Sequence, residues 1–270
     1  MSTTLRDSIT MLRRQAKHIL RYPSLSLMMV LLPVLLLLLF VYVFGGTMGT
    51  GLGVAAVGRK AYVAYVTPGI ILLAIAGVAQ STAISVSMDM ADGIIARFRT
   101  MGISRGAVLA GHVLANTILT LLAVTAVIVV AIAIGFRPNA DVAEWFETFG
   151  LIALATFAIT WLSAALGLRA KSVETASNIG MPLLLLVFLG SGFVPTDSMA
   201  PGLAEFARYQ PFTSVTETLR GLLTGTPVGN DAVLAVVWCA IIGFAGYRWA
   251  LRQYDRDPAR EVRLLSVGSA

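Results

Sequence analysis

The chain has 270 residues, of which 57% are apolar and only 13% are charged, about half the charged share of an average soluble domain. Its mean hydropathy is +0.82, and a soluble fold of this length cannot hide so much apolar surface, because many of its residues must face water. These values exclude a soluble enzyme, a disordered chain and a nucleic-acid-binding domain. The excess of 20 Lys and Arg over 14 Asp and Glu is therefore interpreted as a membrane-topology signal. The single cysteine, Cys239, excludes a disulfide framework and a Cys-based metal site.

Residues 4–22 are predicted to form an amphipathic helix on the membrane surface. Its apolar residues recur at spacings of four and three and so share one face: Leu5, Ile9, Leu12, Ala16 and Ile19. Its basic residues mostly avoid that face, which suits an anionic cytoplasmic interface: Arg6, Arg13, Arg14, Lys17 and Arg21. Pro23 is expected to end this helix. A solvated helix or a frayed terminus is the alternative.

Six apolar stretches follow, each long enough to cross a bilayer core, which requires about 20 helical residues. We expect an all-α integral membrane protein with transmembrane helices at about these residues: 25–44, 62–88, 107–135, 148–168, 175–194 and 231–250. The first stretch is longer than the apolar region of a signal peptide and lacks a good cleavage site after it, so we interpret it as a retained anchor.

The loop charges predict the orientation of these spans. Fifteen Lys and Arg residues fall on the side of the two termini and five on the other side, which places both termini in the cytoplasm. An even number of spans is needed for this, and six agrees. The chain is then one transmembrane domain over 1–270, with an interfacial helix at 1–24, a six-span bundle at 25–250 and a cytoplasmic tail at 251–270.

The second span carries small residues at every fourth position, which permits close helix contact: Gly77, Ser81 and Ser85, with Asp89 at the exit. Residues 89–105 then form the one sizeable internal cytoplasmic loop. Asp89 and Asp92 are placed to cap or charge-match the start of a short helix there. Its apolar patch requires a cover: Ile94, Ile95, Phe98 and Met101. The membrane surface and a partner protein are both open as that cover.

The third span carries a polar stripe of His112, Asn116 and Thr120 at four-residue spacings. In lipid such a stripe should face other helices or water. We expect helix–helix hydrogen bonds, with direct substrate contact as the lesser alternative.

Residues 195–230 contain four prolines and so cannot form a straight span. Two short helices are nevertheless expected, over Leu203–Tyr209 and Phe212–Leu223, with Pro211 suited to the first turn of the second. Glu205 with Arg208, and Glu217 with Arg220, are pairs three residues apart, so their charges can neutralise each other locally. Broken helices dipping into the outer leaflet fit this pattern; a plain extracellular loop is the alternative.

Several kinds of chemistry are missing from the sequence. No GxxxxGK[ST] loop and no HExxH motif occur, so the chain alone should not bind ATP in the usual way or hold zinc in this motif. The middle of each apolar stretch carries no charge, whereas ion-coupled carriers usually need buried ionisable groups, and channels need charged rings or carbonyl filters. If the chain is a transporter, its energy is expected to come from outside the chain.

Three stretches carry a resemblance to a known family: the basic helix before the first span, GIIARFRTMGISRGAVLAGHVL (93–114) and LLLLVFLGSGFVPTDSMAPGLAEFARYQPFTSVTETLRGLL (183–223). They resemble the membrane subunit of type-2 ABC exporters, particularly the daunorubicin-resistance-like permeases of actinobacteria. With the span count, the resemblance covers nearly the whole chain. One departure is Gln210 before Pro211, where relatives often have Asn.

The resemblance implies roles for three segments. Residues 89–105 would be a coupling helix that docks on a separate ATP-binding subunit, through Asp92, Ile94, Ile95, Arg97, Phe98, Arg99 and Met101. Residues 4–22 would be a connecting helix that touches the same subunit. Residues 195–224 would be re-entrant helices that close the exit, and the expected gate residues are Phe193, Pro195, Glu205, Arg208, Pro211, Glu217 and Arg220.

The resemblance also implies the partners. Two permease copies, as a homodimer, would join two ATPase subunits in the bacterial cytoplasmic membrane, and the partner would bind ATP and Mg, with no cofactor and no metal in this chain. The expected cargo is a hydrophobic drug, antibiotic or lipophilic metabolite, with lipid or polysaccharide export as the second choice, because fold does not settle cargo. A membrane scaffold without transport and an ion-coupled carrier remain as alternatives of another class.

Overall fold

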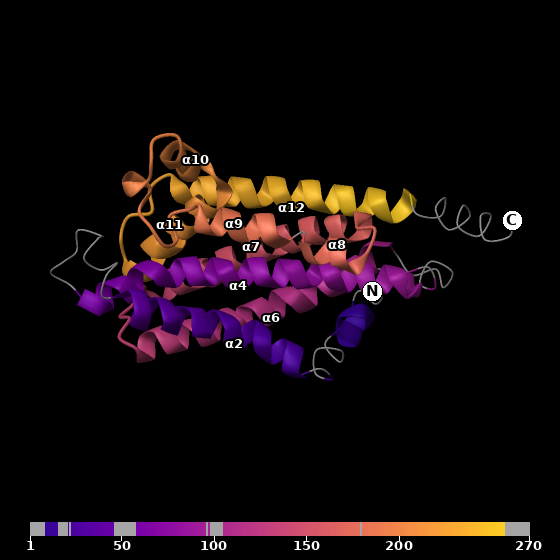
Figure 1. The fold of residues 1–270 in the computed structure, drawn as a ribbon, viewed down its shortest axis with the longest axis horizontal. Coiled ribbons are helices and arrows are strands. Elements are labelled where there is room, and N and C mark those ends of the chain that lie inside the picture. The colour runs from indigo at the N-terminus through magenta and orange to yellow at the C-terminus, as the bar shows by residue number, and fades with distance from the viewer. Residues whose placement is uncertain are drawn as a thin grey trace, which may run out of the picture.

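The computed structural model describes residues 9–15, 21, 23–45, 58–95, 97, 105–178 and 180–256. Most of these residues are helical, and none of those described lies in a β-strand. The long helices run side by side along one axis and form an elongated bundle (Figure 1). The predicted all-α class is confirmed.

In the described part of the chain, five long helices make up the bundle. They are α2 (Pro23–Leu39), which continues as the π-helical turn η1 (Phe40–Phe44), α4 (Gly58–Ala91), α6 (Arg105–Ala133), α7 (Val142–Arg169) and α12 (Asp231–Arg256). Between α7 and α12 lie five shorter elements: α8 (Val173–Asn178), α9 (Gly180–Phe188), the 3-10 turn η2 (Thr196–Ser198), α10 (Leu203–Tyr209) and α11 (Pro211–Thr224). Residues 9–15 form a separate helical segment.

The five long helices are each long and apolar enough to cross a membrane. Their limits differ from the predicted spans by a few residues. The clearest difference is the start of α7, which is Val142 rather than residue 148. Asp141 caps this helix, because its side chain accepts from the Glu144 N–H and the Glu144 carboxylate accepts from the Asp141 N–H, each at 2.7 Å. This reciprocal pair starts the helix earlier than its apolar run.

The predicted fifth span, 175–194, is shorter than expected. Among its described residues α8 and α9 are helical, and α9 ends at Phe188, after which residues 189–193 form turns. These turns pack directly on α4: a Cβ built on Gly69 would lie 2.6 Å from the carbonyl oxygen of Gly192. Such close contact requires glycine on both sides, and it leaves the Val173–Phe188 stretch shorter than the five long helices.

Helix α4 is the centre of the bundle. It is packed by α2, α6, α7, α8, α9 and α11, while α12 packs on α7. Within an 18-residue apolar stretch of its span 78% of residues are buried, against 17% and 22% in the matching stretches of α2 and α12. A helix that is apolar all round belongs in a core, whereas α2 and α12 leave large apolar side chains exposed, including Leu32 and Phe244.

The predicted stripe of small residues on the second span is only partly a contact surface. A Cβ on Gly77 would meet nothing within 4 Å. The close approaches involve other glycines: Gly69 against Gly192, Gly167 against Ala83, and Gly246 against Leu162. Small residues at helical spacing therefore marked a face of α4, but the tight contacts depend on which neighbour lies opposite.

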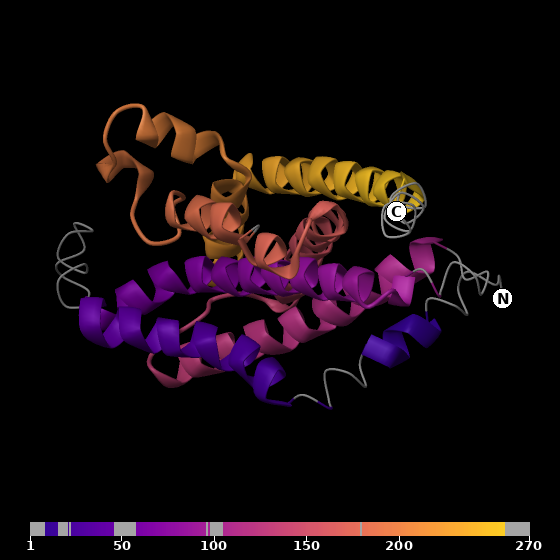
Figure 2. The ribbon, with the colours of Figure 1, turned by 45° about the vertical axis from the view of Figure 1, so that its right-hand side comes forward.

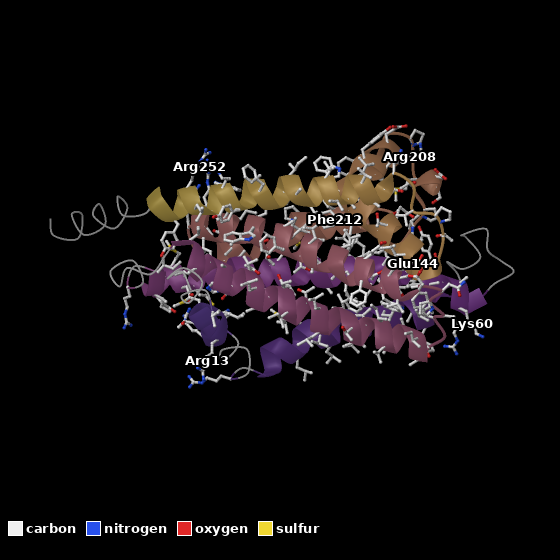
Figure 3. All side chains as sticks on the ribbon, turned by 180° about the vertical axis from the view of Figure 1, so that it is seen from behind. Arg13, Lys60, Glu144, Arg208, Phe212 and Arg252 are labelled. Carbon is white, nitrogen blue, oxygen red and sulfur yellow. The ribbon has the colours of Figure 1, made fainter. Side chains whose placement is uncertain are left out.

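The two ends of the bundle are formed by different segments of the chain. Residues 9–15, the end of α4, the start of α6, α8 and the end of α12 gather at one end, and we call it the inner end (Figures 1 and 2). The start of α4, α10, α11 and the start of α12 gather at the other, the outer end. Arg13 and Arg252 lie at the inner end, and Lys60, Glu144 and Arg208 lie at the outer end (Figure 3).

Candidate functional site

A buried carboxylate at the inner end joins three elements. Asp89, in the last turn of α4, accepts two hydrogen bonds from the Arg14 guanidinium: Nη1 to Oδ2 and Nη2 to Oδ1, each at 3.2 Å. The Nε2 atom of His112 on α6 lies 3.0 Å from Oδ2. The exposed fractions of the side chains are 12% for Asp89, 37% for Arg14 and 3% for His112. Because a carboxylate only accepts, His112 Nε2 carries the proton in this contact.

Residues 9–15 dock on the bundle through a face that the sequence analysis did not single out, while the apolar face was expected to meet the membrane surface. Met11 and Gln15, four residues apart, are buried together. A Cβ on Gly111 of α6 would lie 2.6 Å from the Met11 Cβ, so glycine permits this approach. Ile9, on the predicted apolar face, is 51% exposed and is free to meet lipid. Arg6 and Lys17 lie outside the described residues, and Arg13 and Arg21 are exposed.

The polar stripe on α6 faces α4. The Nδ1 atom of His112 lies 3.5 Å from the Ser85 hydroxyl. Asn116 donates from Nδ2 to the Thr82 hydroxyl at 2.6 Å, and both residues are buried. Thr120 instead donates to the Asn116 carbonyl of its own helix at 2.8 Å. Two of the three stripe residues thus reach across to α4.

The expected coupling loop is described for residues 92–95 and 97. Asp92 and Arg97 are exposed, Ile94 is half-buried, and Gly93 takes a positive φ of 67°. Ile95 is 2% exposed and packs in a cluster with Val86, Leu109, Val113 and Trp161. Its side chain therefore belongs to the bundle interior and is not available to a docking partner. Phe98, Arg99 and Met101 lie outside the described residues.

Asp89 itself does not cap a helix in this loop, contrary to the sequence-based expectation. Helix α4 continues to Ala91, so Asp89 lies inside it. The loop begins only afterwards, where the Asp92 N–H still donates to the Met88 carbonyl at 2.9 Å. The apolar run of the second span did not reveal that the helix extends this far.

At the outer end, α10 and α11 form a helical hairpin that turns at Gln210, with Pro211 in the first turn of α11 as expected. Phe193 is buried and stacks on Phe40 and Phe188, with ring centroids 4.8 and 5.0 Å away. Pro195 is half-buried at the start of the connection to this hairpin.

Arg220 ties the hairpin to α4 and to the turn after α9. Its Nη2 donates to the carbonyls of Ser191 at 2.8 Å and Tyr65 at 3.2 Å, and its Nη1 pairs with Glu217 at 2.5 Å. Its guanidinium carbon also lies 4.0 Å from the centroid of the Tyr65 ring. The Glu217–Arg220 pair was predicted; Tyr65 and Ser191 were not, because they are distant in sequence.

Arg208 forms its ion pair with Asp197, at 2.6 Å. Glu205 adds a weaker electrostatic effect on the Arg208 guanidinium. The hydrogen bond and charge of Asp197 raise the pKa of the Arg208 guanidinium. Both side chains are exposed. The turn η2 brings Asp197 beside α10, a contact between segments that helical spacing could not predict.

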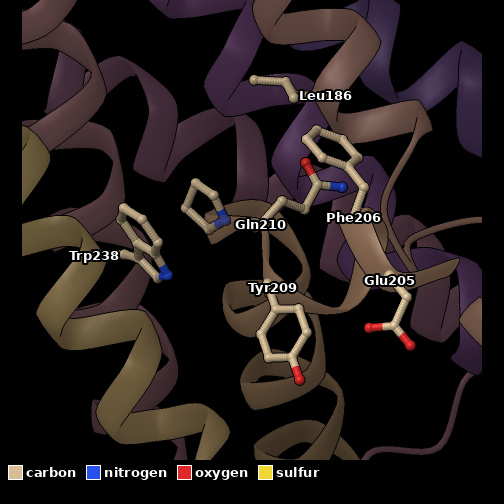
Figure 4. Close-up of a pocket in the computed structure, with 7 residues that line it drawn as sticks. Leu186, Glu205, Phe206, Tyr209, Gln210 and Trp238 are labelled. Carbon is tan, nitrogen blue, oxygen red and sulfur yellow. The ribbon is translucent and has the colours of Figure 1, made fainter. Parts of the chain in front are cut away.

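A groove of about 500 Å³ lies beside the hairpin, lined by Leu186, Glu205, Phe206, Tyr209, Gln210, Pro211 and Trp238 (Figure 4). Gln210 is 4% exposed, and neither atom of its carboxamide has a hydrogen-bond partner among the described residues. The hydroxyls of Ser191 and Thr213 are likewise unpartnered there. In the described part of the chain, no group of three or more His, Cys, Asp or Glu could hold a metal ion.

Comparison with known proteins shows what class of molecule this arrangement belongs to. Residues 7–224 match the ABC-2 type transporter family, and because this match covers most of the 270 residues, the chain belongs to that family. It is a multi-pass permease of the bacterial cell membrane.

Two kinds of curated relative are similar to the chain. The daunorubicin resistance ABC transporter permease protein DrrB1 of Streptomyces coeruleorubidus is 26% identical over 226 residues, which cover 83% of this chain and 77% of that protein. The probable doxorubicin resistance ABC transporter permease protein DrrC of Mycobacterium tuberculosis is 23% identical over 175 residues, covering 62% of this chain and 63% of that protein. The family resemblance inferred from three short stretches is confirmed.

Proposed function

We propose that this chain is the permease subunit of an ATP-driven exporter that moves a hydrophobic drug, antibiotic or lipophilic metabolite out across the cytoplasmic membrane. The observation that carries the proposal is the family match over residues 7–224, which includes both the loop at 92–105 and the hairpin at 203–224. The drug-resistance names of both kinds of relative favour a drug-like cargo. Lipid or polysaccharide export is the second candidate, since one fold can carry different cargoes.

The proposed topology has six spans and both termini in the cytoplasm. It is supported by five long apolar helices, together with the shorter stretch Val173–Phe188 as the remaining crossing. The charge bias along the sequence supports the same orientation, with the inner end facing the cytoplasm. The whole of 1–270 then acts as one transmembrane domain.

In this proposal the ATP-binding subunit acts on the inner end of the bundle. Residues 89–105 dock on a separate ATP-binding subunit, which binds ATP and Mg. The exposed Asp92 and Arg97 and the half-buried Ile94 are the described side chains placed to meet it, and the proposal extends to Phe98, Arg99 and Met101. Residues 4–22 lie on the membrane surface beside the loop and touch the same subunit.

At the outer end, the α10–α11 hairpin acts as the exit gate. Arg220 holds the hairpin on α4 and on the turn after α9, which supports a closed state in this structure. A second copy of the chain completes the transport route, so that two permeases work with two ATPases. The large exposed apolar side chains on α2 and α12 leave faces for lipid and for this second copy.

The proposal is tested by purifying the tagged full chain from its native membrane in mild detergent and measuring ATP hydrolysis. We expect an ATP-hydrolysing subunit to co-purify, and Phe98→Asp to remove it, because a buried charge in an apolar docking contact is costly. Arg252→Gln, which lies on exposed α12 surface at the same end, is the matched control and should retain the partner.

Two outcomes contradict the proposal. A clean preparation without ATPase activity would leave the scaffold and the ion-coupled carrier, and a transport assay that collapses with the proton gradient while ATP remains would favour the carrier. Retention of the partner in Phe98→Asp would show that the loop at 89–105 is not the docking segment.

A further inference from the structure

Three segments that the proposed mechanism treats separately meet at one side chain. Asp89 is bonded to Arg14 from the N-terminal helical segment and to His112 from α6. It also lies three residues before Asp92, where α4 gives way to the loop that is proposed to dock on the ATPase. Helical hydrogen bonding continues from α4 to the start of the loop, since the Asp92 N–H donates to the Met88 carbonyl.

The position of Asp89 is unfavourable for the helix that carries it. A negative charge in the last turn of a helix opposes the helix dipole, and a carboxylate removed from water is costly unless it is paired. Two partners together offset the cost of this buried charge. Arg14 donates two hydrogen bonds to the carboxylate, and His112 makes a third contact with it. Its side chain therefore stabilises the contact between segments rather than α4 alone.

The contact between the segments is specific and tight. Met11 and Gln15 are buried on the same side as Arg14, and Gly111, one residue before His112, admits the Met11 side chain. Further along the bundle, towards the outer end, α4 and α6 continue this polar contact. Ser85 meets His112, and Thr82 meets Asn116. The N-terminal segment is thus held against a two-helix unit that leads directly into the loop.

We propose that Asp89 is a positioning residue that joins the N-terminal helix, the end of α4 and the start of α6 into one unit, so that a push on the loop moves the N-terminal helix with it. This inference rests on the proposed function only for the ATPase that would displace the loop. The joint itself is a property of the isolated permease and is tested without any partner.

The first experiment measures amide hydrogen exchange in residues 9–15 of the full chain in phosphatidylcholine nanodiscs. Exchange reports local opening, so Asp89→Asn should raise the exchange rate of this segment by about fivefold or more, the lower end of coupling effects between sites. Asp89→Glu retains the carboxylate and should restore protection. Glu174→Gln changes an exposed carboxylate on α8 at the same end and should have no effect. Unchanged protection in Asp89→Asn would overturn the proposal.

The second experiment uses the permease with its co-purified ATPase and compares exchange before and after trapping with ATP and vanadate. In the wild-type complex we expect residues 9–15 and 92–105 to change together. In Asp89→Asn the loop should still respond while residues 9–15 no longer do, and Asp89→Glu should restore the joint response. A joint response that persists in Asp89→Asn, or a wild-type complex in which residues 9–15 never respond, would overturn the proposal.

The two experiments separate the proposals. If no ATPase co-purifies with the wild-type chain, the proposed function fails, while the first experiment still decides whether Asp89 holds the N-terminal helix. If the ATPase co-purifies and the first experiment shows no change, the function stands and the joint does not.

Discussion

At the scale of single residues, Arg220 joins several segments at the outer end. Its guanidinium meets the Glu217 carboxylate, two backbone carbonyls and the Tyr65 ring. The two carbonyls belong to α4 and to the turn after α9, so one side chain joins three parts of the chain. A guanidinium suits this task because its donors form a planar fork and it also stacks on aromatic rings.

Replacing Arg220 with Gln should lower the midpoint of thermal unfolding of the detergent-purified chain. We expect a loss of about 2 kcal/mol, since hydrogen bonds to charged groups contribute about 1.5–3 kcal/mol. Arg208→Gln is the control, because its pair with Asp197 is exposed and exposed pairs contribute little. Equal unfolding midpoints for wild type and Arg220→Gln would contradict the assigned role.

The partners of these residues mark a limit of sequence reasoning. Helical spacing places Glu217 beside Arg220 and aligns His112 with Asn116, because residues three or four apart share a face. Spacing says nothing of what lies opposite: Tyr65 is 155 positions from Arg220, and Asp89 and Thr82 belong to another helix. For the same reason the pairing of Arg208 with Asp197 was missed, since η2 approaches α10 only through a loop.

At the scale of helices, long apolar runs were sufficient to locate the five long spans. Their ends were less predictable, because caps and breaks depend on backbone hydrogen bonds. The cap at Asp141 starts α7 early, and the turns at 189–193 end α9 early. Within these turns the backbone of Gly192 contacts that of Gly69.

Gly69 and Gly77 on α4 provide a matched pair for this close approach. Gly69→Ala should destabilise the purified chain, because its Cβ would lie 2.6 Å from the Gly192 carbonyl oxygen. Gly77→Ala should instead stabilise it, by up to about 1 kcal/mol from helix propensity, because no atom lies within 4 Å of the new Cβ. The measurement is thermal unfolding of both variants; an unchanged or raised midpoint for Gly69→Ala would show that the contact between Gly69 and Gly192 is not tight.

At the scale of the whole molecule, the separation of the two ends is the main result. The Asp89 cluster and the end of α4 lie at the inner end, and the hairpin with Arg220 lies at the outer end (Figure 1). Helix α4 runs the length of the bundle and contributes to both, through Asp89 at one end and Tyr65 at the other.

The orientation of the bundle can be tested with single cysteines in a Cys239→Ala background. Ser198→Cys lies exposed on η2 at the outer end, and Ser172→Cys lies exposed before α8 at the inner end. An impermeant thiol reagent should label the first in intact cells and the second only after lysis, because the proposed topology puts the inner end in the cytoplasm. The reverse pattern would invert the topology.

The sequence by itself determined the all-α membrane class, the five long spans and the family, because apolar runs, charge bias and short motifs are local properties of the chain. Tertiary structure alone decided that Ile95 faces the bundle interior, that Asp89 binds Arg14 and His112, and that Gly69 rather than Gly77 meets a neighbour. Periodicity specifies which residues share a face of a helix. What that face meets depends on how helices far apart in the sequence are packed together.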